Sequence, residues 1–294
     1  MARFGMSQLH DPRIRDNRAA RLFVKAFGGF DTGSSHLHFI RIFRCVEAQC
    51  NLRRILDAGC GRGKFSFWVA QNYPSIQVDA CDVREESIAV CKATAAKMGM
   101  SNVNFWVQDL TTVLSEGTYD FVFSNHVLEH IPKNQLVLAN LVRAMRNGGQ
   151  IYIQIPTATQ SRFSFGRKFV QAHEQWAEEE HTGQTLTLDS LRAELEGLGC
   201  TVIIAKHTEG PIGEFRFELE EMALTYFNSS VLFALFFPAL KLLGHVDSRL
   251  DYARGNGILV LACKPGHNQE LSARSSTNNI GGQKWSGSEL AIPC

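Results

Sequence analysis

The sequence predicts an α/β fold, a doubly wound and mostly parallel sheet of seven strands. Three observations predict it: short apolar runs alternate with helical stripes, the links between them are short, and the runs are apolar throughout. Parallel strands that helices cover on both faces show such continuous apolar runs, because both faces are buried. The length of 294 residues and a hydrophobic content of 45% suit one large domain with additions. Ligands of such sheets bind beyond the carboxyl ends of the strands.

The apolar runs give the strands, and apolar residues spaced by three and four give the helices. In chain order, we expect strands at 54–58, 76–83, 103–107, 119–124, 151–155, 201–205 and 257–263. Between them, we expect helices at 64–72, 88–98, 138–145 and 188–198. Thr187 is the expected N-cap of the last of these helices, and Asn147-Gly148-Gly149 is expected to close the third.

Three segments fall outside the alternation and divide the chain. Residues 1–50 predict a helical N-terminal cap, followed by a core over 51–265. That core includes a lid at 156–186 and an apolar helical insertion at 207–255, before the last strand. The stretch 266–294 is rich in Ser, Asn and Gly without periodicity, which predicts a flexible tail.

Composition excludes several classes of protein. Lys and Arg number 30 against 29 Asp and Glu, so the chain lacks the basic surplus of a nucleic-acid binder. The eight cysteines include no Cys-x-x-Cys pair, which argues against a zinc knuckle or a thioredoxin-type site. The first 25 residues hold no apolar signal segment, so we expect a cytoplasmic, reducing location.

A glycine-rich turn joins the first strand to the first core helix. Asp57 is followed by Gly59, Gly61 and Gly63. Glycine lets the backbone turn sharply and approach a ligand closely, and amides at a helix start can receive an anionic group. The alternative is a tight turn that holds no ligand.

Two aspartates end the next two strands. Asp82 can accept hydrogen bonds from both hydroxyls of a ribose, and Asp109 can accept one from the exocyclic amine of adenine. Either aspartate alone is more often a loop cap. Three suitable signals at three consecutive strand ends indicate a nucleoside-containing cofactor.

With these motifs the chain resembles the class I S-adenosylmethionine-dependent methyltransferases, and within them the small-molecule enzymes of the ubiquinone-biosynthesis type. The resemblance covers about residues 50–206 and is carried by 55–66, 81–83, 108–110 and 119–132. The strand at 257–263 fits the reversed last strand of that family. The resemblance therefore implies S-adenosyl-L-methionine as the cofactor and a Rossmann-like methyltransferase fold.

The resemblance also implies a role for each matching residue. The residues that would frame the methionine part are Asp57, Gly59, Cys60, Gly61 and Gly63. Asp82 and Val83 would hold the ribose and the adenine ring, while Asp109 and Leu110 would hold the adenine amine and the ring's other side. Asn125 and His126 would border the methionine end and the reacting methyl.

Methyl transfer from a sulfonium is an in-line displacement, so a base is needed only for a protonated acceptor. His126 and His130 are the candidate bases, with Glu129 expected to pair with a neighbour. We expect no resident metal, although His126-x-x-Glu129-His130 leaves a divalent ion open as an alternative. Weaker candidates near the site are His36, His38, His173, Glu174, the run 178–180 and His181.

Two other functions stay open. A nicotinamide-dependent dehydrogenase would want a glycine where Lys64 stands, and the chain has no Tyr-x-x-x-Lys pair. A module that binds the cofactor without catalysis, acting through its apolar insertion, is the second alternative. We expect an enzyme that methylates a small, apolar or aromatic acceptor, on oxygen first and then on nitrogen or carbon.

The segment 231–243 is the most individual part of the chain. Eleven of its thirteen residues are apolar, with Pro238 and Lys241 interrupting, so it is too short and broken to span a bilayer. Four interpretations are open: a buried pair of lid helices, a homodimer interface, a hydrophobic acceptor pocket, and a contact with a membrane surface or a lipid-like substrate. The 20 Phe against 5 Tyr and 4 Trp favour a dry cap over the site.

Overall fold

A computed structural model describes most of the chain. The described residues are 17–27, 29, 31–157, 160, 163, 170, 174–175, 179–227 and 229–266. The predicted tail, apart from residue 266, and most of the predicted lid lie outside the described residues.

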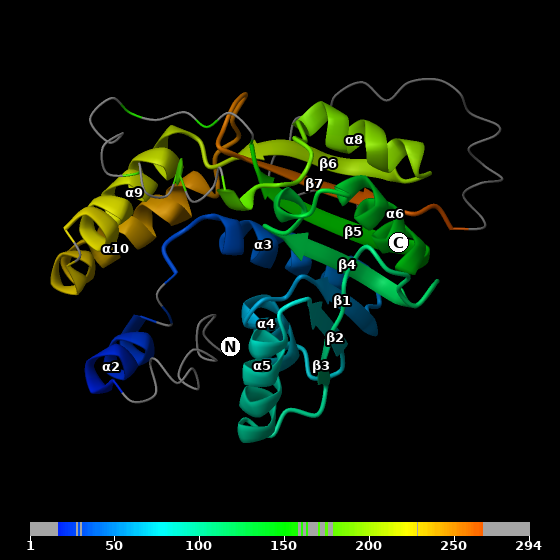
Figure 1. Cartoon of the computed structure of the whole chain (residues 1–294), viewed down its shortest axis with the longest axis horizontal. Helices are drawn as coiled ribbons and strands as arrows, with labels where there is room; N and C mark the ends of the chain where they lie inside the picture. The colour runs from blue at the N-terminus through cyan, green and yellow to red at the C-terminus, as the bar shows by residue number, and fades with distance from the viewer. Residues whose placement is uncertain are drawn as a thin grey trace.

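The predicted seven-stranded sheet is confirmed (Figure 1). Its strands are β1 (Arg54–Ala58), β2 (Gln77–Asp82), β3 (Val103–Val107), β4 (Tyr119–Asn125), β5 (Met145–Pro156), β6 (Thr201–Thr208) and β7 (Gly257–Cys263). They lie in the order β3-β2-β1-β4-β5-β7-β6, and β7 is antiparallel to both of its neighbours. The strand order reverses between β1 and β4, so the ends of these two strands mark the place where a ligand is expected.

The start of β5 differs from the prediction. Residues 147–149, predicted to close a helix, belong to this strand, which begins at Met145 directly after α6 (Asn134–Ala144). The Gly148 amide donates to the carbonyl of Lys264, and the Lys264 amide donates to the carbonyl of Gly149. A Cβ on Gly149 would lie 2.9 Å from the carbonyl oxygen of Tyr119. Close pairing within the sheet therefore outweighs the local signal for a helix end.

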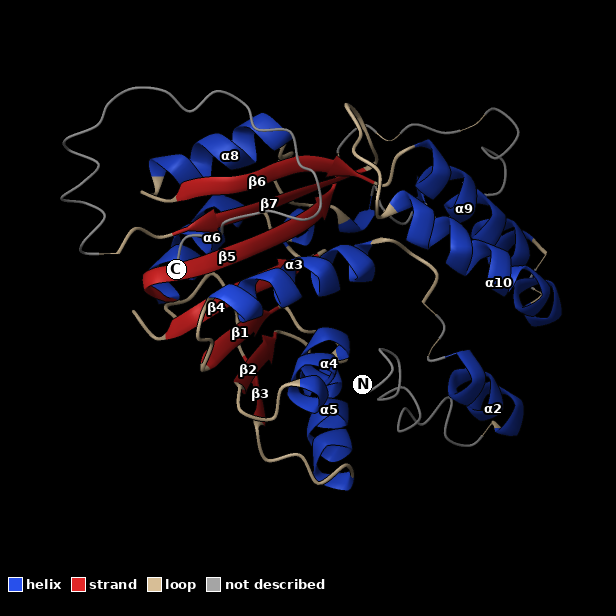
Figure 2. Ribbon diagram, turned by 180° about the vertical axis from the view of Figure 1, so that it is seen from behind, coloured by secondary structure: helices blue, strands red, loops and turns tan. Residues whose placement is uncertain are grey.

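Helices cover both faces of the sheet (Figure 2). On one face, α3 (Ser35–Gln49), α4 (Lys64–Asn72) and α5 (Glu85–Lys97) lie over side chains such as Ile55 and Phe121. On the other face, α6 and α8 (Leu188–Gly197) cover Leu56 and Val122. Because successive strand residues point to opposite faces, both faces need apolar residues, and this produces the unbroken apolar runs. Thr187 caps α8 as predicted, in a capping box with Ser190.

The insertion before β7 folds as two helices joined by one turn of π-helix. They are α9 (Pro211–Glu221), the π-helical turn η3 (Met222–Tyr226) and α10 (Ser230–Asp247). Phe237 of α10 packs against Phe23 of α2 (Arg18–Phe27), with ring centroids 4.7 Å apart. Figure 1 shows α9 and α10 side by side beyond one end of the sheet.

In the described part of the chain, packing covers the inner face of α10 and leaves its outer face exposed. On the inner face Phe233, Phe237 and Leu240 are buried. On the outer face Val231, Leu235 and Leu242 are 73%, 72% and 64% exposed. Burial inside the chain thus accounts for half of this helix, and a homodimer or membrane contact for the other half stays a prediction. Within the described residues, no helix has the length and apolarity needed to cross a membrane.

Candidate functional site

The glycine turn between β1 and α4 takes a backbone shape that favours glycine. Gly59, Gly61 and Gly63 all have positive φ, at 84°, 52° and 72°. A Cβ on Gly59 would lie 2.3 Å from Cγ2 of Val127, whereas one on Gly61 would meet nothing within 4 Å. The turn is therefore held tightly on one side and open on the other, as a cradle for a ligand requires.

Asp82 ties the end of β2 to this turn. Its buried carboxylate accepts the Gly61 amide at 2.8 Å through Oδ2 and the Arg84 amide at 2.9 Å through Oδ1. Each carboxylate oxygen offers about two lone pairs, so both oxygens can still accept a hydroxyl. This geometry fits a ribose.

A cleft of about 720 Å³ opens beside the turn. Six of the residues predicted to bind the cofactor line it: Gly59, Asp82, Val83, Asp109, Leu110 and His126. The side chain of Val83 is 66% exposed, an apolar surface that an adenine ring could cover. Hydrogen bonds from the Thr111 amide and hydroxyl hold the pKa of Asp109 below its usual value, which keeps it an acceptor.

Five other predicted residues do not line this cleft: Asp57, Cys60, Gly61, Gly63 and Asn125. Asp57 is buried and accepts the hydroxyl of Ser66 at 2.5 Å, and burial raises its pKa to about 7. Its hydrogen bond to Ser66 links the end of β1 to α4, on either side of the glycine turn. Both polar atoms of the Asn125 amide are buried without a hydrogen-bond partner in the described part of the chain, so this group has bonding capacity to spare.

A second cavity, of about 300 Å³, lies on the other side of His126. Its lining comes from the ends of the central strands and from α9: His126, Glu129, His130, Pro156, Gln160, His181, Glu209, Gly213, Glu214, Arg216, Phe217 and Asn256. His126 and His130 line both the cleft and the cavity. Sequence reasoning missed the α9 residues and Glu209, because their proximity depends on how the insertion folds back over the sheet.

The backbone is strained at two positions in this cavity. Among the described residues other than glycine, His126 and Glu209 are the ones with positive φ, at 54° and 56°. The His126 amide donates to the carbonyl of Gln154, and the carbonyl of Glu209 accepts the amide of Asn256. Non-glycine residues in this conformation are uncommon, and they cluster where function needs a side chain placed against local preference.

His126 and Glu129 form a pair at the cavity wall. Nδ1 of His126 lies 3.5 Å from Oε1 of Glu129, whose side chain is 8% exposed. Partial burial lowers the pKa of His126, but the hydrogen bond and charge of Glu129, with the charge of Glu209, outweigh it, so the pKa is raised. The imidazole is 41% exposed and remains accessible to a ligand. This pairing confirms the expectation that Glu129 supports a neighbour.

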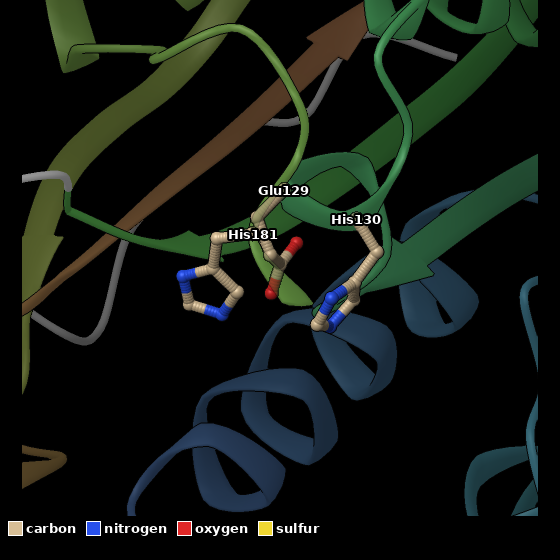
Figure 3. A group of neighbouring side chains, drawn as sticks. All are labelled: Glu129, His130 and His181. Atoms are coloured by element: carbon tan, nitrogen blue, oxygen red, sulfur yellow. The ribbon is translucent and has the colours of Figure 1, made fainter. Parts of the chain in front are cut away.

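Glu129, His130 and His181 converge at the same wall (Figure 3). One ligand atom of each lies within 4.8 Å of those of the other two. These are donor types that a divalent ion accepts, and His181 stands where the sequence suggested His126. Nδ1 of His130 lies 3.1 Å from the carbonyl oxygen of Glu180; because a carbonyl only accepts, Nδ1 is the donor in this contact.

The remaining histidine candidates lie elsewhere or outside the described residues. His36 and His38 of α3 are buried, and burial lowers the pKa of each to about 3. Neither lines the cleft or the cavity. His173 lies outside the described residues.

Comparison with known proteins defines the class. A family model described as a methyltransferase domain matches residues 51–198, and the chain belongs to this family. A probable (S)-tetrahydroprotoberberine N-methyltransferase of Papaver bracteatum is 30% identical over 37% of this chain and 31% of its own length. A malonyl-[acyl-carrier protein] O-methyltransferase of Ilyobacter polytropus is 33% identical over 33% of this chain and 35% of its own. The chain thus spans about a third of the length of these curated relatives.

Solved structures share the fold. A putative sarcosine dimethylglycine methyltransferase of Galdieria sulphuraria has a TM-score of 0.55 at 14% identity, over 85% of this chain and 99% of that one. A phosphoethanolamine N-methyltransferase of Haemonchus contortus, solved with S-adenosyl-L-methionine, has a TM-score of 0.53 at 19% identity, over 72% of this chain and 49% of that one. Residues 51–198 thus form a methyltransferase domain, and the chain shares the fold of these solved enzymes.

Proposed function

We propose that the chain transfers a methyl group from S-adenosyl-L-methionine in the 720 Å³ cleft to a small acceptor in the 300 Å³ cavity. The observation that carries the proposal is that His126 and His130 line both spaces. A donor and an acceptor on either side of one short wall can be aligned for in-line displacement. Alignment and exclusion of water are the main tasks of the protein in such a reaction.

The residues at the cleft fit the donor. Asp82 would accept hydrogen bonds from the ribose hydroxyls. Val83 and Leu110 would pack against the adenine ring, and Asp109 would accept a hydrogen bond from the amine of that ring. Asn125, with its unsatisfied buried amide, would reach the methionine end. When bound, the donor supplies an electrophilic methyl group on a sulfonium.

His126 would act as the base for an acceptor that must lose a proton. Its Nδ1 faces Glu129, which leaves Nε2 for the acceptor proton. The cavity lining holds three carboxylates and three imidazoles beside apolar surface. This lining suits an acceptor that presents a protonated oxygen or nitrogen on an apolar body.

Binding and turnover test the proposal separately. Calorimetry should show S-adenosylmethionine and S-adenosylhomocysteine binding to the full chain, with affinity at least tenfold weaker in Asp82→Ala. The control Asp189→Ala, on the exposed start of α8, should bind as the parent does. Undiminished binding by Asp82→Ala would sink the cofactor assignment, provided that urea unfolding shows both variants folded.

A panel of phenols, alcohols, amines and acids then distinguishes an enzyme from a module that only binds the cofactor. Methylated product that depends on His126 would support the enzyme. Tight cofactor binding without product from any acceptor class would favour the non-catalytic alternative. Reduction of a nicotinamide would favour the dehydrogenase.

A further inference from the structure

We propose that the 300 Å³ cavity recognises the ammonium group of an amine, which makes the acceptor atom nitrogen. This inference rests on the proposed function and narrows its acceptor. It follows from the charge of the cavity wall, from its hydrogen-bonding character, and from the strained residues that point to a built site.

The wall carries an excess of negative charge. Among the described residues that line it, Glu129, Glu209 and Glu214 bring carboxylates and Arg216 brings a guanidinium. Nη1 of Arg216 is held 2.5 Å from Oε2 of Glu220 and 2.9 Å from the hydroxyl of Thr32, so its charge is already balanced. Carboxylates that line a cavity attract a cation more strongly than they would on the open surface.

The wall is also rich in hydrogen-bond acceptors. Oε2 of Glu129 is buried, and within the described residues no donor reaches it. An ammonium group brings up to three donors, whereas an alcohol or phenol brings one and a ketone none. An acceptor without a donor would leave Oε2 of Glu129 unpaired, which costs binding energy.

Two independent features mark the cavity as a built site. Glu129 is more than nine-tenths buried, yet one of its oxygens has no partner in the described chain. His126 and Glu209, the described non-glycine residues with positive φ, both face this space. Strain at two residues from different strand ends is retained where it positions side chains for a ligand.

The chemistry balances with these residues. A bound ammonium, R–NH₃⁺, has no lone pair, so it first gives a proton to the His126 imidazole, whose positive charge Glu129 offsets. The nitrogen lone pair of R–NH₂ then forms the N–CH₃ bond as the S–CH₃ bond breaks, and that bond's electrons stay on sulfur. The products are R–NH₂⁺–CH₃ and the neutral thioether of S-adenosylhomocysteine. The proton on His126 leaves to solvent.

Matched ligand pairs test the inference by binding alone. The full chain, saturated with S-adenosylhomocysteine, is titrated with 2-phenylethylamine and 2-phenylethanol, and with butylamine and butanol, at pH 7. We expect each amine to bind at least tenfold more tightly than its alcohol. Glu129→Gln and Glu209→Gln should each weaken amine binding about tenfold and change alcohol binding less than twofold. Glu196→Gln, an exposed charge change on α8, should alter neither.

Each contrary result has a distinct meaning. Equal binding of amines and alcohols, with S-adenosylhomocysteine bound, overturns the amine and leaves the methyltransferase proposal intact. Failure of S-adenosylhomocysteine to bind overturns both. Tight Mn²⁺ or Zn²⁺ binding that displaces the amine and is lost in His181→Ala would show that the wall is a metal site, and would also overturn the amine.

Discussion

Replacing Gly59 with alanine should damage the glycine turn beside the cleft. At φ 84° the new side chain sits in a left-handed conformation, and its Cβ would lie 2.3 Å and 2.7 Å from the two methyl groups of Val127. Gly61 provides the matched control. It also has positive φ, at 52°, but a Cβ there meets nothing within 4 Å.

The expected cost follows from these two contributions. A left-handed alanine costs about 1–2 kcal/mol, and forcing an extra carbon into a packed position costs about 1–3 kcal/mol. Gly59→Ala should therefore lower the free energy of unfolding by about 2–5 kcal/mol, and Gly61→Ala by about 1–2 kcal/mol.

Urea unfolding of four variants isolates the clash. They are Gly59→Ala, Gly61→Ala, Val127→Ala and the double variant Gly59→Ala/Val127→Ala. Removing the Val127 methyl groups leaves Cβ of Val127 at 3.1 Å from the new carbon, so most of the overlap disappears. The double variant should be more stable than the sum of the single changes predicts, by about 1–3 kcal/mol.

One result would refute this reasoning. If Gly59→Ala and Gly61→Ala lose the same stability and the Val127 change gives no coupling, the backbone conformation alone determines the need for glycine. The close approach of Val127 would then have no energetic role in shaping the turn.

Three further predictions concern buried carboxylates. Burial raises the pKa of Asp57 from 3.8 to about 7, so its contribution to stability is fully present below pH 3.8 and is lost as pH rises through 7. Asp57→Asn should therefore gain stability over the parent at pH 8 compared with pH 5 in urea unfolding, by about 3 kcal/mol at most. Glu129→Gln should lower the pKa of His126 in an NMR titration. Because that pKa is raised in the folded chain, the stability from the pair is present below pH 6.5 and should vanish as pH rises through the folded pKa. Asp120→Ala should lose about 2–4 kcal/mol in the same unfolding assay, since its carboxylate accepts two backbone amides at the start of β1, at 2.6 Å and 2.7 Å; a loss below about 0.5 kcal/mol would contradict this assignment.

The elements of the core could be predicted from the sequence because their signals are local. The bounds of β1, α4, β3 and β7 match the prediction residue for residue. Each is an apolar run or stripe whose period depends only on neighbouring residues. The failure at Asn147-Gly148-Gly149 has the opposite cause, since there the distant partners Tyr119 and Lys264 decide the conformation.

The candidate site likewise contains residues that local signals place and residues whose positions depend on contacts with distant segments. Gly59, Asp82, Val83, Asp109 and Leu110 line the cleft because each lies at a strand end, and the carboxyl ends of parallel strands meet at one edge. Asp57 does not line the cleft, and its carboxylate accepts the hydroxyl of Ser66 instead. Successive strand residues point to opposite faces, and the spacing of the motif does not show which face Asp57 takes.

By itself the sequence determined the sheet, the glycine turn and the class of cofactor, all of which depend on short-range patterns. Only the tertiary structure decided that His181 approaches His130, and that Glu209 and α9 bring carboxylates to the cavity. These groups lie far apart in the sequence, and nothing in local periodicity encodes how two distant segments pack. The proposed charge of the acceptor therefore depends on the folded wall, where Oε2 of Glu129 is buried without a partner among the described residues.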